Sequence, residues 1–283
     1  MGVVIMKSIQ ISYDKDFAKK CRFAAEAGFT HITVSFHNME DYSDDAFQKA
    51  PEKILSILNE NNLKTIQSHA PYYDLLVSAE ITDEEVERRF IRSIETSGKL
   101  GVKWCVIHPR TYLTGGYNKE KSFNESVKTI SKYLEYAQKY NTGIAVENLM
   151  SWGNNPRTII YGSEYKELAE LCDEFNSERL KICWDFGHAN IMRNEFSQQE
   201  AIKYLGERIK CTHIHNNYGD RDYHLPPDAG NIDWQSAMKA LKEINYSGPF
   251  TLETHCLYPE DGMLRDFARY NYNCLEFLER LFK

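Results

Sequence analysis

Residues 211–234 hold the densest set of side chains in the chain that could do chemistry. His213 and His215 stand two apart at the end of a short apolar run, and residues two apart on a strand face the same side of a sheet. Asp222 and His224 repeat that spacing in the loop that follows. Imidazole and carboxylate groups gathered in this way suit a divalent metal such as Zn²⁺ or Mn²⁺. A lone histidine at a strand end is more often a hydrogen-bonded core residue, so the metal hypothesis depends on further ligands elsewhere.

Residues of the same kind end six consecutive apolar runs. In chain order the ends are His69, His108, Glu147, Asp185, His213 and Glu253, with His188 three residues beyond Asp185. A charged side chain at the end of a buried strand is costly unless it is paired or binds a metal. No cysteine stands at these ends, so a soft thiolate site is not expected. The six ends predict one carboxylate–imidazole site for Zn²⁺ or Mn²⁺, with Co²⁺ and Mg²⁺ as further options.

Short apolar runs alternate with amphipathic ones along the whole chain. Strands are predicted at residues 5–11, 31–36, 63–69, 103–108, 144–147, 180–185, 209–215 and 249–253, and helices at residues 14–27, 44–58, 83–100, 119–140, 163–175, 197–205, 234–244 and 263–282. Strict alternation implies a parallel sheet, and eight units in this length match a (β/α)8 TIM barrel. An open doubly wound sheet is the alternative, but no glycine-rich turn follows the first predicted strand. In a barrel, the carboxyl ends of all strands converge on one mouth.

Composition narrows the class of protein. The chain has 283 residues, is 42% hydrophobic and shows no linker or composition break, so a single domain over residues 1–283 is predicted. A net charge of −7 argues against bulk binding to nucleic acid or anionic membranes. Seven cysteines without a C-x-x-C spacing indicate small buried residues in a reducing, cytoplasmic compartment. Residues 1–6 are too short an apolar run for a signal peptide or a membrane span, and no membrane partner is expected.

These features resemble the xylose-isomerase-like TIM-barrel superfamily over essentially the whole chain. The motifs that carry the resemblance are Trp184-Asp185-Phe186-Gly187-His188, His213-Ile214-His215-Asn216-Asn217, Asp222-Tyr223-His224 and Gly230-Asn231-Ile232-Asp233-Trp234, together with the strand ends Val146-Glu147-Asn148 and Leu252-Glu253-Thr254. The superfamily contains sugar isomerases, ketose 3-epimerases, inosose dehydratases and the type-four abasic-site endonucleases.

The sugar-converting branch implies one divalent metal ion and a pair of acid–base residues. By resemblance, the metal ligands are Glu147, Asp185, His213 and Glu253. Glu147 and Glu253 are expected to face a substrate from opposite sides, one removing a proton and the other returning it, with His188 as a catalytic hydrogen-bond donor. The expected substrate contacts are His69, His108, His188, Arg221, His224 and Trp152, and the aromatic rings of Tyr72 and Phe36 are candidates for the pocket wall.

The endonuclease branch implies two more metal ions. There His69 and His108 join Glu147 around a second ion, and His188, Asp222 and His224 hold a third, so His69, His108, Asp222 and His224 are candidate additional ligands. Two departures favour the sugar branch. Thr254 is followed by His255 where the endonucleases have Thr-Pro, and His213 is followed by Ile-His-Asn-Asn where they have Leu-Asn-Asp-Ser. The predicted loops also hold no run of Lys and Arg to track phosphates, since Arg110, Arg157 and Arg221 stand alone in separate loops.

The sequence therefore predicts a metal-dependent isomerase or epimerase of a small sugar, sugar phosphate or polyol. It would act by proton transfer at the carbon next to a carbonyl. The alternatives are a zinc-dependent abasic-site endonuclease, an inosose-dehydratase-like lyase and a non-catalytic sugar-binding barrel. Barrels of the superfamily often self-associate, so a homo-oligomer is among the expected states.

Overall fold

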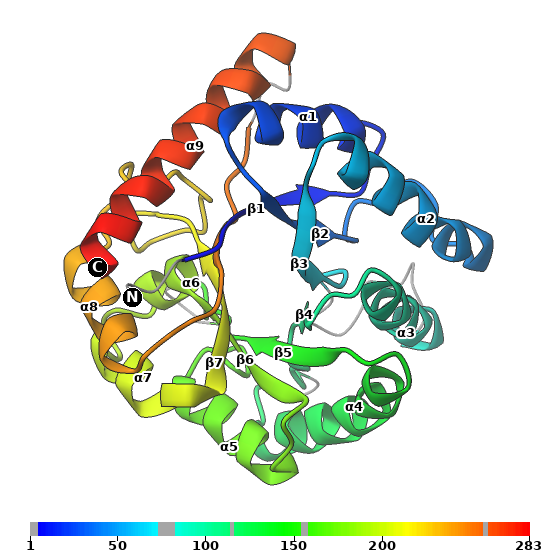
Figure 1. Cartoon of the computed structure of the whole chain (residues 1–283). Coiled ribbons are helices and arrows are strands. Elements are labelled where there is room, and N and C mark those ends of the chain that lie inside the picture. Colours follow the sequence, from blue (N-terminus) through cyan, green and yellow to red (C-terminus); the bar gives the residue numbers. More distant parts are fainter. Residues whose placement is uncertain (1–4, 73–82, 114–115, 154–157, 257–259) are drawn as a thin grey trace.

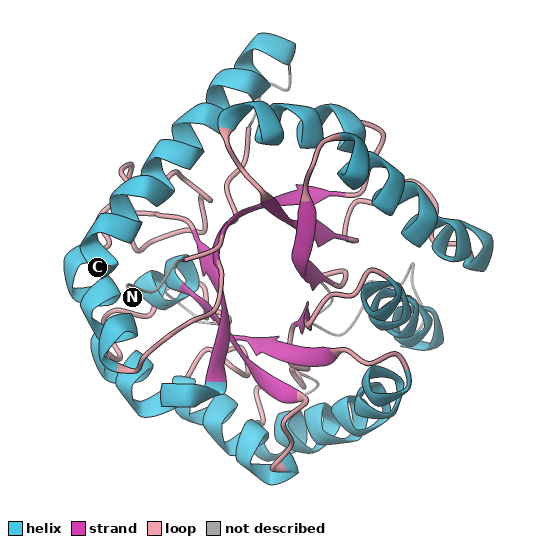
Figure 2. Ribbon diagram, in the orientation of Figure 1, coloured by secondary structure: helices cyan, strands magenta, loops and turns pink. Residues whose placement is uncertain are grey.

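A computed structural model of the chain describes residues 5–72, 83–113, 116–153, 158–256 and 260–283. In these residues eight parallel strands close into a barrel in chain order, which confirms the predicted (β/α)8 fold. Figures 1 and 2 show the strands as an inner ring with the helices around it. The strands are β1 (Lys7–Ser12), β2 (His31–Ser35), β3 (Lys64–His69), β4 (Trp104–Ile107), β5 (Gly143–Glu147), β6 (Leu180–Asp185), β7 (Ile209–Ile214) and β8 (Phe250–Leu252).

The helices follow the predicted alternation, with one addition. They are α1 (Phe17–Ala27), α2 (Asp44–Glu60), α3 (Asp83–Lys99), α4 (Lys119–Lys139), α5 (Tyr165–Phe175), α6 (Phe186–Ile191), α7 (Gln198–Leu205), α8 (Trp234–Glu243) and α9 (Asp261–Phe282), with the short 3-10 helix η1 (Gly206–Arg208) before β7. The sequence did not predict α6, because six residues are too few to show a helical period. Asp185 begins it by accepting a hydrogen bond from the backbone N–H of His188 at 2.6 Å.

The start of α1 also differs from the sequence prediction. We expected a helix from residue 14, but α1 begins at Phe17. Asp14 instead accepts a hydrogen bond from the backbone N–H of Asp16 at 2.9 Å. A carboxylate that bonds two residues ahead makes a local turn that competes with helix formation.

The barrel interior is apolar in one layer and polar in the next. Trp104, Val106, Ala145, Cys183 and Cys211 form a buried apolar cluster. Cys183 pairs with Cys211 in the sheet, and two residues further along the same strands Asp185 pairs with His213. Because side chains two apart on a strand share a face, the layer that contains Asp185 and His213 lies directly beyond the apolar layer, toward the carboxyl ends of the strands.

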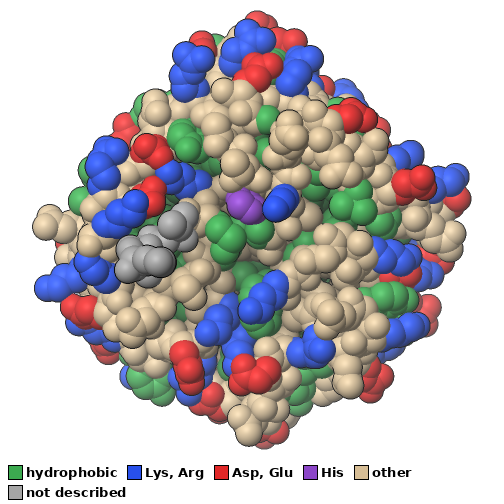
Figure 3. Space-filling model, viewed as in Figure 1, with side chains coloured by type: hydrophobic (Ala, Val, Ile, Leu, Met, Phe, Trp, Pro, Cys, Tyr) green, Lys and Arg blue, Asp and Glu red, His purple; other side chains and the backbone are tan. Residues whose placement is uncertain are grey.

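Two further observations concern the cysteines and the surface. Six of the seven cysteines are buried and no disulfide links any of them, as expected for small core residues. Over the described ranges, no helix is long and apolar enough to span a bilayer. On the face seen in Figure 3, basic and acidic side chains are interspersed around the rim.

Candidate metal centre

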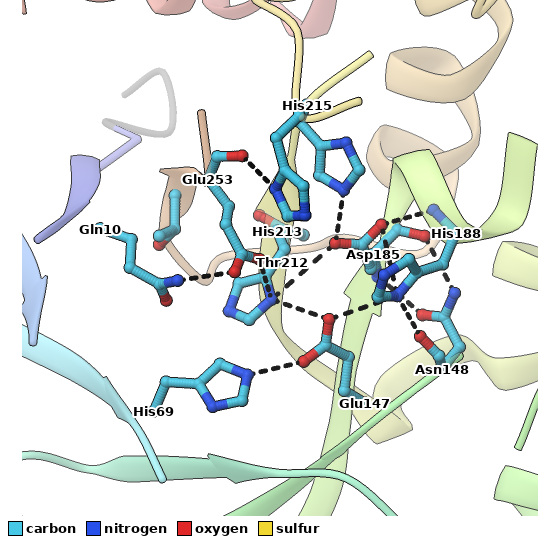
Figure 4. A network of polar contacts seen from close by, with 12 residues as sticks. Gln10, His69, Glu147, Asn148, Asp185, His188, Thr212, His213, His215 and Glu253 are labelled. Atoms are coloured by element: carbon cyan, nitrogen blue, oxygen red, sulfur yellow. Dashed lines mark hydrogen bonds and ion pairs between the residues drawn. The ribbon is translucent and has the colours of Figure 1, made fainter. Parts of the chain in front are cut away.

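Four side chains from neighbouring strand ends converge in the barrel mouth. Each of Glu147, Asp185, His213 and Glu253 offers a ligand atom, these atoms lie within 4.8 Å of one another, and all four residues are buried. Nδ1 of His213 lies 3.0 Å from Oε1 of Glu147 and 2.9 Å from Oε2 of Glu253 (Figure 4). Asp185 lies further off, with Oδ2 at 3.9 Å from the same nitrogen. The four predicted ligands of the central metal are therefore brought together.

The carboxylates and the imidazole of this group shift one another's pKa. Burial lowers the pKa of His213, but the carboxylates of Glu147 and Glu253 outweigh it and raise that pKa well above its ordinary value. Burial raises the pKa of Glu147, but the imidazoles of His213, His108 and His69 outweigh it and hold that pKa well below its ordinary value. Buried carboxylates this close repel one another unless positive charge lies between them, and the protonated ring of His213 or a bound cation would supply it. The donor set of three carboxylates and one imidazole fits a divalent cation such as Zn²⁺ or Mn²⁺.

A second group shares Glu147 with the first. His69, His108 and Glu147 also place ligand atoms within 4.8 Å of one another. Nε2 of His69 lies 2.9 Å and Nε2 of His108 3.3 Å from Oε2 of Glu147. The ring of His69 is oriented by Nδ1–H, which donates to the carbonyl oxygen of Ala70 at 2.6 Å. An imidazole held this way directs Nε2 toward the carboxylate, where its lone pair could bind a cation that the carboxylate also binds, as in metal-ligating histidines.

The third group lies in the loop after β7. His215, Asp222 and His224 place ligand atoms within 4.8 Å of one another, so His215 takes the place predicted for His188, which groups with Asp185 and His215 instead. Nδ1–H of His224 donates to the carbonyl oxygen of Glu253 at 2.8 Å, and Nε2 lies 2.9 Å from Oδ2 of Asp222. Burial lowers the pKa of His224, but Asp222 and Glu253 outweigh it and raise that pKa to about 9. His224 also has a positive φ of 49°, a strained backbone for a non-glycine residue and typical of functional sites.

His188 and His215 flank Asp185 from two sides. Nδ1–H of His188 donates to the carbonyl oxygen of Asn148 at 2.8 Å, and Nε2 lies 3.5 Å from Oδ2 of Asp222. Burial lowers the pKa of His188, but Asp185 and Asp222 outweigh it and raise that pKa well above its ordinary value. His215 is fully buried and its Nε2 lies 3.1 Å from Oδ2 of Asp185. The sequence analysis placed His215 in the motif that begins at His213, but it did not predict the contact of His215 with Asp185.

A small cavity opens onto the metal centre. It has a volume of about 120 Å³ and is lined by Tyr72, His108, Glu147, Leu149, Met150, Trp152, His188, Asp222, His224 and Glu253. Tyr72 and Trp152 thus lie where a pocket wall was predicted. Phe36 does not: it is fully buried in the core, with its ring 6.3 Å from that of Phe47. The cavity is lined both by carboxylates and imidazoles and by aromatic and apolar side chains.

The arginines do not reach this cavity in the described part of the chain. Arg221 is exposed, and its guanidinium lies 5.9 Å from the ring of Tyr223 instead. Arg110 pairs with Asp83 at 3.2 Å. Arg157 lies outside the described residues. No Lys or Arg is among the described residues that line the cavity.

Two glutamines belong to the site and were missed from the sequence. Nε2 of Gln10 donates to Oε1 of Glu253 at 2.6 Å, and the amide of Gln67 contacts Nε2 of His213 at 2.9 Å. Tyr72 adds a second donor to Oε1 of Glu253, through its hydroxyl at 3.1 Å. The signal in the sequence was a long polar side chain at an inward position of an otherwise apolar strand.

Comparisons with known proteins agree with this architecture. A family model described as a xylose isomerase-like TIM barrel matches residues 21–271. An uncharacterized protein of Methanocaldococcus jannaschii is 27% identical over 238 residues, which are 78% of this chain and 78% of that protein. A probable endonuclease 4 of Mycoplasma mobile is 26% identical over 240 residues, covering 79% of this chain and 76% of that protein.

A solved structure with the same fold is the D-allulose 3-epimerase from Methylomonas sp. It superposes with a TM-score of 0.74 over 99% of this chain and 100% of that chain, at 19% identity. At that identity the likeness concerns the fold. The family model, in contrast, spans most of the sequence, and by that match the chain belongs to the xylose isomerase-like TIM-barrel family.

Proposed function

We propose that the protein is a divalent-metal-dependent isomerase or epimerase of a sugar or polyol. The observation that carries the proposal is the pair of carboxylates from β5 and the end of β8, which approach His213 at 3.0 and 2.9 Å. Both Glu147 and Glu253 line the cavity beside it. Two carboxylates that face one space can remove a proton from one side of a carbon and return it from the other. The fold shared with a D-allulose 3-epimerase supports the same class of reaction.

The cation and the carboxylates have separate tasks. Glu147, Asp185, His213 and Glu253 would hold a divalent ion, which would supply Lewis-acid polarisation of a carbonyl and so acidify the neighbouring C–H bond. Each glutamate directs one oxygen toward His213, while its second oxygen is held by other partners. For Glu147 these partners are His69 and His108, and for Glu253 they are Gln10 and Tyr72. Both carboxylates are thus fixed in direction before a substrate arrives.

The remaining lining residues orient the substrate. Nδ1–H of His188 donates to the carbonyl oxygen of Asn148, which leaves Nε2 near Asp222 and able to bond a substrate hydroxyl in the cavity. Leu149, Met150 and Trp152 cover the opposite side with apolar surface and exclude water from the reacting carbon. Return of the proton by the second glutamate to the opposite face inverts the carbon. Return of the proton to the neighbouring carbon, with transfer of the hydroxyl proton between the two oxygens, isomerises the sugar.

Hydrogen exchange with solvent tests the proposal directly. In D₂O, with Mn²⁺ or Zn²⁺ added, the enzyme should incorporate deuterium next to the carbonyl of a free ketose, as followed by NMR and mass spectrometry. Glu147→Gln should lose most of the exchange because the amide cannot accept the proton. Glu178→Gln is the matched control, since that side chain is 96% exposed and lies away from the cavity. Absence of exchange in a broad panel of ketoses and aldoses by the metal-loaded enzyme would reject the proposal.

A second candidate, phosphodiester hydrolysis at a cluster of three ions, has one specific observation in its favour. His69 and His224 each donate Nδ1–H to a backbone carbonyl and direct Nε2 at a carboxylate, which creates two more ligand groups beside the central one. The probable endonuclease 4 of Mycoplasma mobile is among the relatives. Against it stands the absence of Lys and Arg from the described cavity lining. Three zinc ions per chain and cleavage of an abasic DNA duplex would favour the nuclease, and a dehydrated product from an inosose would favour the lyase.

A further inference from the structure

A second cavity lies where the strands of the barrel begin, at the end opposite to the metal centre. It has a volume of about 680 Å³, within the range of roughly 300–1,000 Å³ that is usual for small-molecule sites. Trp104 and Ile209, which line it, are the first residues of β4 and β7, and Pro249 directly precedes β8. Its described lining shares no residue with that of the cavity at the metal centre. We call it the amino-end cavity.

The amino-end cavity belongs to the face of the molecule seen in Figures 1 and 3. The strands follow one another clockwise in Figure 1, and because the crossovers between parallel strands are right-handed, this view looks onto the starts of the strands. In Figure 3 the same face is hollowed near its centre, with several Lys or Arg side chains around the hollow. Lys103, Glu207 and Asn245 of the cavity lining are exposed, so solvent reaches the cavity from this face.

Two irregularities of strand pairing border the amino-end cavity. The register of β2 with β3 passes over Ile66, and the register of β6 with β7 passes over Lys210. Both of these residues line the cavity. An extra residue in one strand changes the direction of its side chain, and such bulges are frequent at barrel rims and beside functional sites. The bulges of β3 and β7 therefore shape two sides of this cavity.

Lys103 and Lys210 bring two positive charges to the cavity. Lys103 is exposed, with Nζ 5.7 Å from the centre of the Trp104 ring, and Lys210 is half-buried. Neither ammonium group pairs with a carboxylate of the described residues, whereas Lys7 of β1 pairs with glutamates of α9. Glu207 is the one acidic residue in the described lining. Two lysines against one glutamate leave the cavity with a net positive charge.

The turn before β8 adds hydrogen-bond donors beside these charges. Within the described chain, the backbone N–H groups of Ser247 and Gly248 donate to no protein oxygen. Gly248 packs directly on the backbone of Lys210, since a Cβ atom at this glycine would lie 2.3 Å from the carbonyl oxygen of Lys210. Ammonium groups and backbone N–H groups gathered in one place are the donors that bind phosphate oxygens.

The rest of the lining includes apolar surface. Met6, Ile66 and Ile244 are half-buried side chains of the same cavity. Apolar atoms that stay partly exposed in a cavity gain free energy when a ligand removes them from water. The lining therefore suits a molecule that joins an anionic group to an organic part, rather than a bare anion.

We propose that the amino-end cavity binds a phosphate-bearing small molecule. Lys103, Lys210 and the backbone N–H groups of Ser247 and Gly248 hold the phosphate, and the organic part lies against Ile66 and the other apolar side chains. Sugar phosphates and nucleotides share this chemistry. The site uses neither the metal ligands nor the two candidate acid–base glutamates, so the inference stands independently of the proposed function.

Titration calorimetry with three probes tests the inference. Inorganic phosphate, glucose 6-phosphate and AMP are each titrated into the full chain. We expect one of the two esters to bind once per chain, with a Kd at least about tenfold lower than that of inorganic phosphate. No saturable binding of any probe up to about 10 mM would overturn the inference. Inorganic phosphate that binds as tightly as both esters would indicate an adventitious ion only, and would overturn it as well.

Charge variants locate the bound ester. Lys210→Gln and Lys103→Gln should each weaken its binding, by about tenfold for Lys210, because a charge-assisted bond to phosphate is lost. Glu207→Gln should strengthen binding by about threefold, since it removes a like charge from the rim. Lys49→Gln is the control, because that side chain is 61% exposed on α2 and pairs with Asp45.

A variant of the metal centre distinguishes the two ends of the barrel. An ester bound at a metal ion would be lost from Asp185→Ala and retained by Lys210→Gln, whereas the amino-end cavity predicts the reverse. Unchanged affinity in a folded Lys210→Gln protein, or loss of binding in Asp185→Ala, would place the phosphate elsewhere and overturn the inference.

Discussion

In the barrel interior, the side-chain amide of Gln67 contacts Nε2 of His213 at 2.9 Å. The contacting atom is the amide nitrogen of Gln67, which donates to the ring, and a half-turn of the amide would place its oxygen there as an acceptor instead. Nδ1 of His213 faces Glu147 and Glu253, so a metal ion on Nδ1 leaves the ring proton on Nε2. With the amide of Gln67 turned, the ring would donate to its oxygen, and that bond would determine which nitrogen is available to the ion.

Removal of the Gln67 amide, which contacts His213, should weaken metal binding. Gln67→Leu leaves Nε2–H of His213 without an acceptor, and loss of such a bond typically lowers metal affinity about 10–100-fold. Titration calorimetry of the metal-free protein with Mn²⁺ or Zn²⁺ measures the change. Gln67→Glu supplies a carboxylate oxygen in the same place and should retain the affinity. Equal affinity in the leucine variant would mean that Gln67 has no part in orienting His213.

The number of ions should not depend on His108 if the site is that of a sugar isomerase. His108→Ala removes one contact to Oε2 of Glu147 but leaves the central ligand group intact. We expect the metal content per chain to stay the same, while KM rises or kcat falls for the ketose substrate. Asp185→Ala, in the central group, should in contrast lose most of the metal. A metal content that falls on His108→Ala would favour a cluster of several ions.

His37 should make the metal-free protein sensitive to mild acid. Burial first, and then the neighbouring imidazoles of His69 and His108, lower the pKa of His37 from 6.5 to about 4. The unfolded chain takes up a proton below pH 6.5 and the folded chain does not, so stability present above pH 6.5 is lost as the pH falls toward 4.

The variant His37→Asn should lose less stability as the pH falls through this range. Asn keeps an acceptor for the backbone N–H of Tyr72, which bonds Nδ1 of His37 at 3.0 Å, but it does not titrate. Thermal unfolding midpoints of both proteins are compared across that pH window with excess chelator, so that metal binding does not contribute. Parallel curves for the two proteins would mean that other groups cause the loss.

Gly187 should be irreplaceable because of the histidine beside it. A Cβ atom at this position would lie 1.9 Å from Cε1 of His215, whose ring is fully buried. Gly187→Ala should destabilise the fold by roughly 1–3 kcal/mol through overpacking. Gly262 is the control: it lies in α9 with nothing near its Cβ position, so Gly262→Ala should be neutral or add about 0.5–1 kcal/mol. Denaturant unfolding measures both changes, and equal stability of the two variants would contradict the packing argument.

The sequence predicted the fold and the meeting of the six polar strand ends for one physical reason, whereas the choice of four of these residues as ligands of one ion came from the family resemblance. Parallel strands in a barrel end at the same mouth, so a polar residue at the end of each apolar run had to lie near the others. Glu147, Asp185, His213 and Glu253 needed only this rule to be brought together. The roles of these residues stay predictions, since position alone does not assign chemistry.

Other parts of the site depend on contacts that cannot be predicted from the spacing of residues in the sequence. Gln10 and Gln67 look like ordinary polar residues in strands, and only the closed barrel brings them to Glu253 and His213. Arg221 was expected at the substrate, but its loop turns the side chain outward over Tyr223. The conformation of a loop is set by its own hydrogen bonds rather than by a period in the sequence, which is why strand ends were easier to predict than loop residues.

The side chain of Asn148 continues the sheet past the point where the backbone ladder stops. Its amide oxygen accepts from the backbone N–H of Asp185 at 2.6 Å, and its amide nitrogen donates to the backbone carbonyl of the same residue at 2.9 Å. These two hydrogen bonds add one more link between β5 and β6. The ends of the strands that carry Glu147 and Asp185 are therefore held together. The distance between these two candidate ligands is therefore fixed by the pairing of β5 with β6. The folded chain can present both side chains to a metal ion without first rearranging.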